Sequence, residues 1–99
     1  MKQSDLLDRM GGIFEDCRDL AERKNSDYAG NDALENLRQF GTLGIVVRLS
    51  DKFARIKNLV QKEPSVKDEK LEDTLMDIIN YAALAIIMNE ENKELELPF

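Results

Sequence analysis

The chain has 99 residues, a formal net charge of −6, one cysteine and no histidine. This length predicts one domain, residues 1–99, with a modest core, and the negative charge disfavours nucleic-acid polymers as partners, because neutralising their phosphates needs a positive surface. Without histidine, hydrolytic chemistry would depend on carboxylates, lysine, tyrosine or metal-bound water.

The localisation follows from two absences in the sequence. The N-terminal residues MKQSDLLDRM lack the basic start and apolar run of a secretory signal, and no apolar stretch approaches the roughly 20 residues that cross a bilayer. We therefore expect a cytoplasmic protein with no membrane partner. Cys17 cannot form a disulfide within one chain, and its place on an apolar helix stripe favours a packing role.

The first predicted element is an amphipathic helix over residues 4–23. Its apolar residues recur at spacings of three and four, at Leu7, Met10, Phe14, Cys17 and Ala21. Residues 24–32, KNSDYAGND, are dense in turn formers and predict a loop.

A short helix and a second long helix are predicted next. Asp32 and Glu35 have the spacing of a capping box that opens the short helix, and Gly41 closes it. The second long helix is expected to start after Thr42 and to stop at Pro64. Its apolar seam is Val46, Leu49, Phe53, Ile56 and Val60.

The last long helix is predicted from a start capped by Ser65 and Asp68 to about Asn89. Its apolar seam is Leu71, Leu75, Ile78, Ala82 and Ala85, and from Ile78 to Met88 nearly every face is apolar, which predicts burial all round. The C-terminal ELELPF could be a local strand, an arm laid on a partner, or frayed.

These elements predict an all-α fold, a small bundle of three long helices plus a short one. Three such helices enclose a ligand site poorly, so we expect oligomerisation, as a homodimer or a higher assembly, to complete the bundle.

A polar stripe on the last helix carries the first candidate site. Glu69, Asp73, Asp77 and Asn80 lie at spacings of four, four and three, on one side of the helix. Buried carboxylates at this spacing would repel one another, and a divalent cation such as Mg²⁺ would offset that repulsion. Acidic residues early in a helix are also favoured by the helix dipole, and the spacing alone favours a solvated face over a metal site.

A cationic segment on the second helix carries the other candidate site. RLSDKFAR, residues 48–55, contains Arg48, Asp51, Lys52 and Arg55. Two arginines and a lysine suit phosphate oxygens. The alternative is a set of solvated pairs, such as Asp51 with Arg55, which the spacing alone favours.

Three motifs occur in order over residues 24–88, namely K-N-x-D-Y, R-x-x-D-K-x-x-R and E-x-x-x-D-T-x-x-D-x-x-N-Y-A. On these residues the chain resembles a phage and bacterial family, the nucleotide modification associated domains. That family is linked to the all-α MazG-like pyrophosphohydrolases, which use Mg²⁺ to cleave a nucleoside triphosphate into the monophosphate and pyrophosphate.

The resemblance implies roles for the motif residues. The metal ligands would be Glu69, Asp73 and Asp77 with Asp51, and Asp51, Asp73 and Asp77 would also be catalytic. Phosphates would bind Arg48, Lys52 and Arg55. The base or sugar would lie near Lys24, Asn25, Asp27, Tyr28, Asn80 and Tyr81.

The sequence departs from the MazG-like pattern in one respect. The paired E-x-x-E and E-x-x-D motifs do not stand here in that form, and the second helix offers only Asp51 as an obvious acidic ligand. Two hypotheses therefore stay open. The first is a pyrophosphohydrolase dependent on Mg²⁺, or on Mn²⁺, acting on (deoxy)nucleoside triphosphates. The second is a non-catalytic protein that binds or sequesters a nucleotide or nucleotide messenger.

Overall fold

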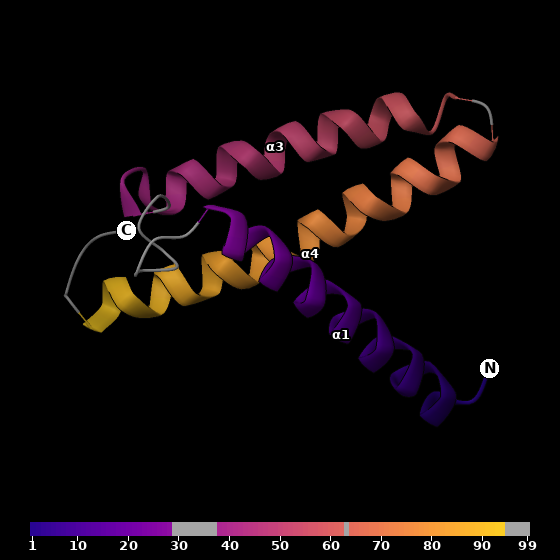
Figure 1. The fold of residues 1–99 in the computed structure, drawn as a ribbon, viewed down its shortest axis with the longest axis horizontal. Coiled ribbons are helices and arrows are strands. Elements are labelled where there is room, and N and C mark those ends of the chain that lie inside the picture. Colours follow the sequence, from indigo (N-terminus) through magenta and orange to yellow (C-terminus); the bar gives the residue numbers. More distant parts are fainter. Residues whose placement is uncertain (29–37, 63, 95–99) are drawn as a thin grey trace.

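The computed structural model describes the backbone of residues 1–28, 38–62 and 64–94 and the side chains of residues 1–24, 38–62 and 70–93. Those residues form three α-helices and no strand: α1 (Gln3–Tyr28), α3 (Gly41–Leu59) and α4 (Pro64–Glu94) (Figure 1). The all-helical prediction is confirmed for this part of the chain. None of these helices has an apolar stretch sufficient to span a membrane.

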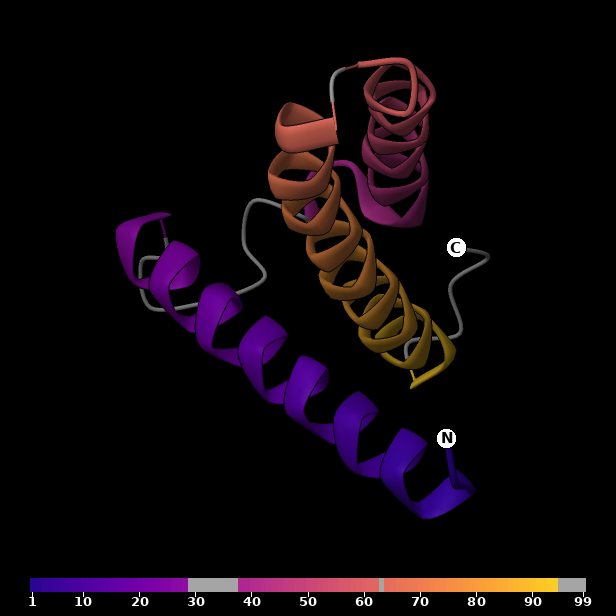
Figure 2. The same ribbon diagram turned by 90° about the vertical axis from the view of Figure 1, so that its right-hand side faces the viewer.

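Helix α4 is the central element. It packs along α3 in an antiparallel hairpin and contacts α1 more sparsely, so that it lies between the other two helices (Figure 2). The N-terminal half of α1 extends away from the hairpin (Figure 1). The core of a single chain is therefore the seam between α3 and α4.

The seam uses the spacing of four and three that lets two helices pack along their length. On α3 its members are Ile45, Leu49, Lys52, Ile56 and Leu59, all buried or half-buried. Ile45 is fully buried. At the open end of the hairpin, the Asn92 amide donates to Thr42 Oγ1 at 3.5 Å, which fixes the register of the two helices.

The predicted seams are wrong in part. On α3, Val46, Phe53 and Val60 are exposed, while their neighbours one residue earlier face α4. On α4, Leu75 and Ala82 are exposed. Both helices carry apolar side chains on two adjacent flanks, so spacing alone does not decide which flank meets the partner helix.

The prediction that α4 is buried all round from Ile78 to Met88 is also wrong, because Ile86 and Ile87 are exposed.

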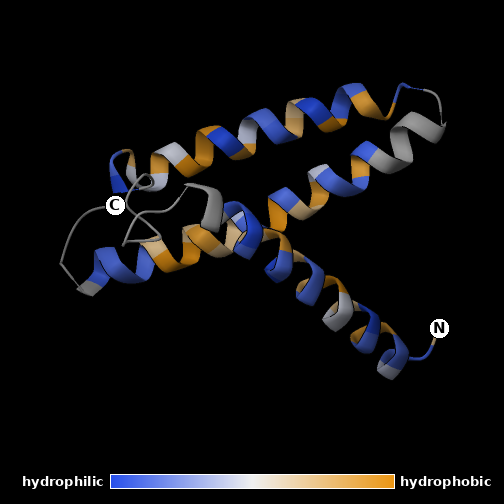
Figure 3. Cartoon of the chain, in the orientation of Figure 1, coloured by the Kyte–Doolittle hydropathy of each residue, from blue (hydrophilic) through white to orange (hydrophobic). Residues whose placement is uncertain are grey.

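On α1, Cys17 is buried as expected, but Ala21 is exposed, and so are the three larger apolar members of the predicted stripe, namely Leu7, Met10 and Phe14. These three lie on the half of α1 that extends beyond α4, where Figure 3 shows hydrophobic segments among hydrophilic ones.

Helices α1 and α4 extend beyond their predicted ends, whereas α3 ends at Leu59, before the predicted stop at Pro64. Helix α1 continues to Tyr28, so residues 24–28 are helical and not the start of a loop. They contain neither glycine nor proline, and a contact of Lys24 with α4 anchors them. Helix α4 begins at Pro64, since proline suits the first turn of a helix, and it continues past Asn89 to Glu94.

The extra length of α4 has contacts of its own. Arg38 donates two hydrogen bonds to Glu91, from Nε at 3.1 Å and from Nη2 at 2.8 Å. This bidentate pair holds the last turns of α4 against the chain that enters α3. At that entry Gly41 adopts φ +63°, the left-handed conformation expected of a glycine at a helix boundary.

Two predicted elements cannot be compared with the structure. The short helix opened by Asp32 and Glu35, and the ELELPF tail, lie outside the described residues.

Candidate functional site

An open groove of about 490 Å³ lies on the flank of α3, beside its seam with α4. Its lining is mostly polar: Arg48, Asp51, Lys52, Ala54, Arg55 and Asn58 from α3, and Tyr81 from α4. Three cationic side chains against one carboxylate give this surface a local charge opposite to that of the whole chain.

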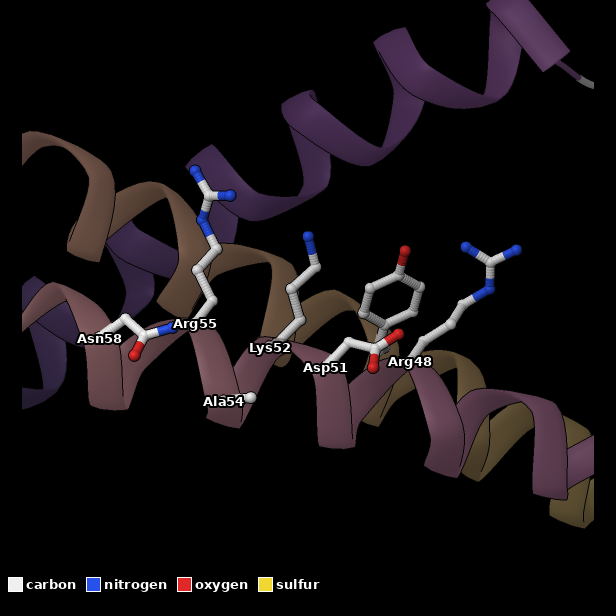
Figure 4. A pocket seen from close by; sticks show the side chains of 7 residues that line it. Arg48, Asp51, Lys52, Ala54, Arg55 and Asn58 are labelled. Atoms are coloured by element: carbon white, nitrogen blue, oxygen red, sulfur yellow. The ribbon is translucent and has the colours of Figure 1, made fainter.

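Helical geometry brings the cations together. Positions 48, 52 and 55 are separated by four and three residues, which places them on one face over about 10 Å of helix. Figure 4 shows Arg48, Lys52 and Arg55 extending from α3 in the same direction. The arrangement is a row of donors along one side of the groove.

Two of these cations have no ionic partner. Arg48 and Arg55 form no salt bridge with any other residue that the structure describes, although Asp51 lies within one helical turn of both. The solvated Asp51–Arg55 pair allowed by the sequence is therefore not formed. Two guanidinium groups with free donors beside a groove can bind a planar or tetrahedral oxyanion.

Lys52 belongs both to the groove and to an ion-pair cluster centred on the half-buried Asp77. Asp77 accepts from Lys24 Nζ through Oδ1 at 2.8 Å, and its Oδ2 lies 3.0 Å from Lys52 Nζ. The Asp77 side chain is 15% exposed. One carboxylate thus joins all three helices.

Burial alone would raise the pKa of Asp77. The hydrogen bonds and positive charges of Lys24 and Lys52 outweigh that effect and hold the pKa of this carboxyl below its usual value. Asp77 is therefore ionised at neutral pH, and both of its oxygens are engaged by lysines.

Asn80 completes the docking of α1. Its amide donates to the backbone carbonyl of Cys17 at 3.0 Å, so the partner that an asparagine needs in an apolar helix comes from α1. The Cys17 thiol lies at the same contact, where burial, with a smaller contribution from Asp16, raises its pKa. Cys17 is a packing residue in its thiol form.

Comparison with known proteins gives one match. A family profile described as nucleotide modification associated domain 1 matches residues 24–88. The chain belongs to this family. Neither the search of curated proteins nor that of solved structures found a match.

The residues that match the nucleotide modification associated domain contain all three sequence motifs. In the structure, one residue of each motif takes part in the same ion-pair cluster. Lys24 comes from the first motif, Lys52 from the second and Asp77 from the third, and they form the ion-pair cluster. Segments more than 20 residues apart in the sequence thus meet at one carboxylate.

The predicted phosphate ligands Arg48, Lys52 and Arg55 line the groove together, and Tyr81 lines it from α4. Of the other residues predicted near the base or sugar, Lys24 and Asn80 hold α1 on α4 and are not among the groove-lining residues. The side chains of Asn25, Asp27 and Tyr28 lie outside the described residues. The roles of these five residues stay predictions.

The four predicted metal ligands do not come together in the described part of a single chain. Asp51 and Asp73 are exposed, Asp77 is engaged by two lysines, and the Glu69 side chain lies outside the described residues. The described side chains contain no group of three carboxylate or thiol ligands that could hold a metal ion. The described side chains of one chain thus do not assemble the predicted four-ligand site, and the metal-binding roles of these residues stay predictions.

Sequence reasoning missed Asn58 as a groove residue. Asn58 is three residues after Arg55 and seven after Asp51, so it continues the same helix face. That spacing was a usable signal. Asn58 adds a side-chain amide, which can both donate and accept, at the far end of the cationic row.

Proposed function

We propose that this protein binds a nucleotide through its phosphates in the α3 groove and acts as a nucleoside triphosphate pyrophosphohydrolase. The substrate would be a ribo- or deoxyribonucleoside triphosphate, and the products the monophosphate and pyrophosphate. The observation that carries the binding step is the pair of unpartnered arginines, Arg48 and Arg55, beside Lys52 in an open groove. The reaction itself is proposed from the likeness to MazG-like enzymes.

Phosphate recognition follows from the donors in the row. Each arginine presents a planar fork that fits two oxygens of one phosphate, while Lys52 contributes a point charge between them. The same groups would stabilise the charge that develops on a departing pyrophosphate. Binding needs no rearrangement of the arginines, because neither has an ion pair to break.

The proposed cofactor is Mg²⁺, with Mn²⁺ as an alternative. A divalent cation would supply charge neutralisation and an activated water in such a reaction. The described carboxylates of one chain do not form its site, so the metal dependence is a separate part of the proposal with its own test.

Assays of pyrophosphate release test the enzymatic part. Purified protein would be incubated with each common ribo- and deoxyribonucleoside triphosphate, with Mg²⁺, with Mn²⁺ and with neither. Pyrophosphate release with at least one substrate is expected, and a blank across the whole panel would refute hydrolysis.

Arg55→Gln should lower turnover or affinity at least tenfold, because it removes a charged phosphate donor at a cost of about 1.5 kcal/mol or more. Lys57→Gln is the matched control. It removes a charge from an exposed position of α3 that is not among the groove-lining residues, and it should leave activity unchanged.

A second candidate function is nucleotide binding without turnover. The engagement of Asp77 by Lys24 and Lys52 favours it, because that carboxylate holds no free oxygen for a cation. Calorimetry discriminates the two candidates. Nucleotide binding of unchanged affinity with and without Mg²⁺, and no product, would support sequestration of a nucleotide or nucleotide messenger and exclude hydrolysis.

We also propose that the working form is a homodimer or a higher assembly of this chain. The support is a set of exposed large apolar side chains, among them Val46, Phe53 and Val60 at intervals of seven on α3 and Leu75 and Ile86 on α4, which a partner chain could cover. Light scattering should give a mass of two chains or more, and a monomer at micromolar concentration would refute the assembly.

A further inference from the structure

A second hollow, of about 520 Å³, lies at the start of α3. Its lining differs from that of the cationic groove: Gln39, Phe40, Gly41, Gly44, Ile45 and Val47 join Arg48 and Asp51. Arg48 and Asp51 line both depressions, so the hollow and the groove are continuous.

Helix periodicity supports this continuity. Gly44, Arg48, Asp51, Arg55 and Asn58 recur at spacings of four, three, four and three, and so form one stripe on α3. From Gly44 to Asn58 the stripe advances by 14 residues, or about 21 Å at 1.5 Å per residue. Its first part is apolar and its second part is cationic.

Phe40 gives the hollow an aromatic surface. Its side chain is 68% exposed, which is unusual for a phenylalanine unless a partner covers it. It lies against Gly44: a methyl group at Gly44 would be only 2.5 Å from Phe40 Cβ. Glycine at position 44 thus accommodates the close approach of Phe40 Cβ at the start of α3.

We propose that this hollow is the nucleobase subsite, in which the base of a nucleotide stacks on Phe40 while its phosphates extend along Arg48, Lys52 and Arg55. The inference rests on the proposed nucleotide binding and adds the position of the base. A planar aromatic base fits an apolar hollow with one exposed ring, and the shared Arg48 sets the order of base and phosphates along α3.

Binding measurements with two probes test the subsite. The first probe is dATP, with the other common nucleotides in parallel, and the second is inorganic tripolyphosphate, which has phosphates but no base. Calorimetry on the whole chain should show that Phe40→Ala weakens nucleotide binding about tenfold, as loss of a base–aromatic stack does, and leaves tripolyphosphate binding unchanged. Phe40→Tyr, which keeps the ring, should retain nucleotide affinity.

Two further variants complete the design. Leu43→Ala is the matched control, because it truncates an equally exposed apolar side chain of the same turn that is not among the hollow's lining residues. Gly44→Ala should reproduce the effect of Phe40→Ala by displacing the ring. Circular dichroism of each variant verifies that the helices are retained.

The outcomes separate the two proposals. If Phe40→Ala binds nucleotide as tightly as the parent while Arg55→Gln loses both probes, the subsite is refuted and phosphate binding stands. If the parent binds tripolyphosphate as tightly as every nucleotide, the base makes no contact and the subsite is again refuted. If the parent binds neither probe, the proposed function fails and the subsite fails with it.

Discussion

Replacing Asp77 by asparagine should destabilise the fold in a pH-dependent way. Asp77 is the carboxylate that joins α1, α3 and α4 through Lys24 and Lys52. Asparagine keeps the size of the side chain and removes its charge. It leaves the two ammonium groups close together without the anion between them.

The magnitude follows from the exposure of the two partners. Lys24 is 53% exposed, so its pair is worth about 0.5 kcal/mol, as for solvated ion pairs. Lys52 is 28% exposed and packs in the seam, so its charge-assisted hydrogen bond is worth about 1.5 kcal/mol. The free energy of unfolding should fall by about 2 kcal/mol at pH 7, which lowers the Tm by about 8–16 °C for a chain of this size.

The pH dependence has a definite sign. The pKa of Asp77 is lower in the folded chain than in the unfolded chain, so its stabilisation is complete above the unfolded value of about 3.9 and is lost as the pH falls through the folded value. The difference in stability between the parent and Asp77→Asn should therefore be full at pH 7 and shrink below about pH 4.

Urea denaturation followed by far-ultraviolet circular dichroism, at a series of pH values, measures this difference. Asp73→Asn is the matched control, one turn earlier on α4. Asp73 is exposed and forms no ion pair with another described residue, so its replacement should change stability by less than about 0.5 kcal/mol. An Asp77→Asn effect of the same size at pH 7 and at about pH 3 would show that the carboxylate is not acting through its charge.

Three further predictions concern the helices themselves. Gly11→Ala should raise the free energy of unfolding by about 0.5–1 kcal/mol in urea denaturation, because a methyl group there meets nothing within 4 Å and alanine favours the helix; a decrease would contradict the exposed interior position. Ile45→Ala should lower the free energy of unfolding by about 2–5 kcal/mol, since Ile45 is fully buried. Val46→Ala should lower it by less than about 0.5 kcal/mol in a single chain, because Val46 is exposed. Equal losses for the two variants would show that Ile45 is not in the α3–α4 seam. Cys17 should react with a thiol reagent slowly in buffer and rapidly in denaturant, because the residue is 2% exposed and burial raises the pKa of its thiol. Fast labelling in buffer would indicate that α1 detaches readily.

The sequence predicted the helices better than their contacts. Apolar spacing identified three long helices, but it did not identify the hydrogen bond by which Asn80 connects α4 to α1. The partner itself, the Cys17 carbonyl, is 63 residues away in the chain and could not be inferred from local pattern. Helix ends were predicted too early wherever a distant side chain extends the helix, as Glu91 does by pairing with Arg38.

Lys52 shows why the candidate site was only partly predictable. The family resemblance implied that Lys52 is a phosphate ligand, yet it occupies a seam position between Leu49 and Ile56. A lysine can do both, because its aliphatic stem packs among apolar side chains while its ammonium reaches a polar partner. Sequence spacing gives the face of a helix, but it does not show how far along that face a long side chain reaches.

The net charge of the whole chain and the local charge of the groove have opposite signs, and this difference affects which phosphate compounds can bind. The chain carries a net charge of −6, but the groove presents three cations and one carboxylate over about 10 Å of α3. Charges are screened beyond about 8 Å at physiological ionic strength, so a small ligand within the groove experiences mainly the local cations. A nucleic-acid polymer would extend past the groove over a chain whose net charge is negative. The charge distribution therefore favours a free nucleotide over a strand, and it makes binding less salt-dependent than for a protein that neutralises many phosphates at once.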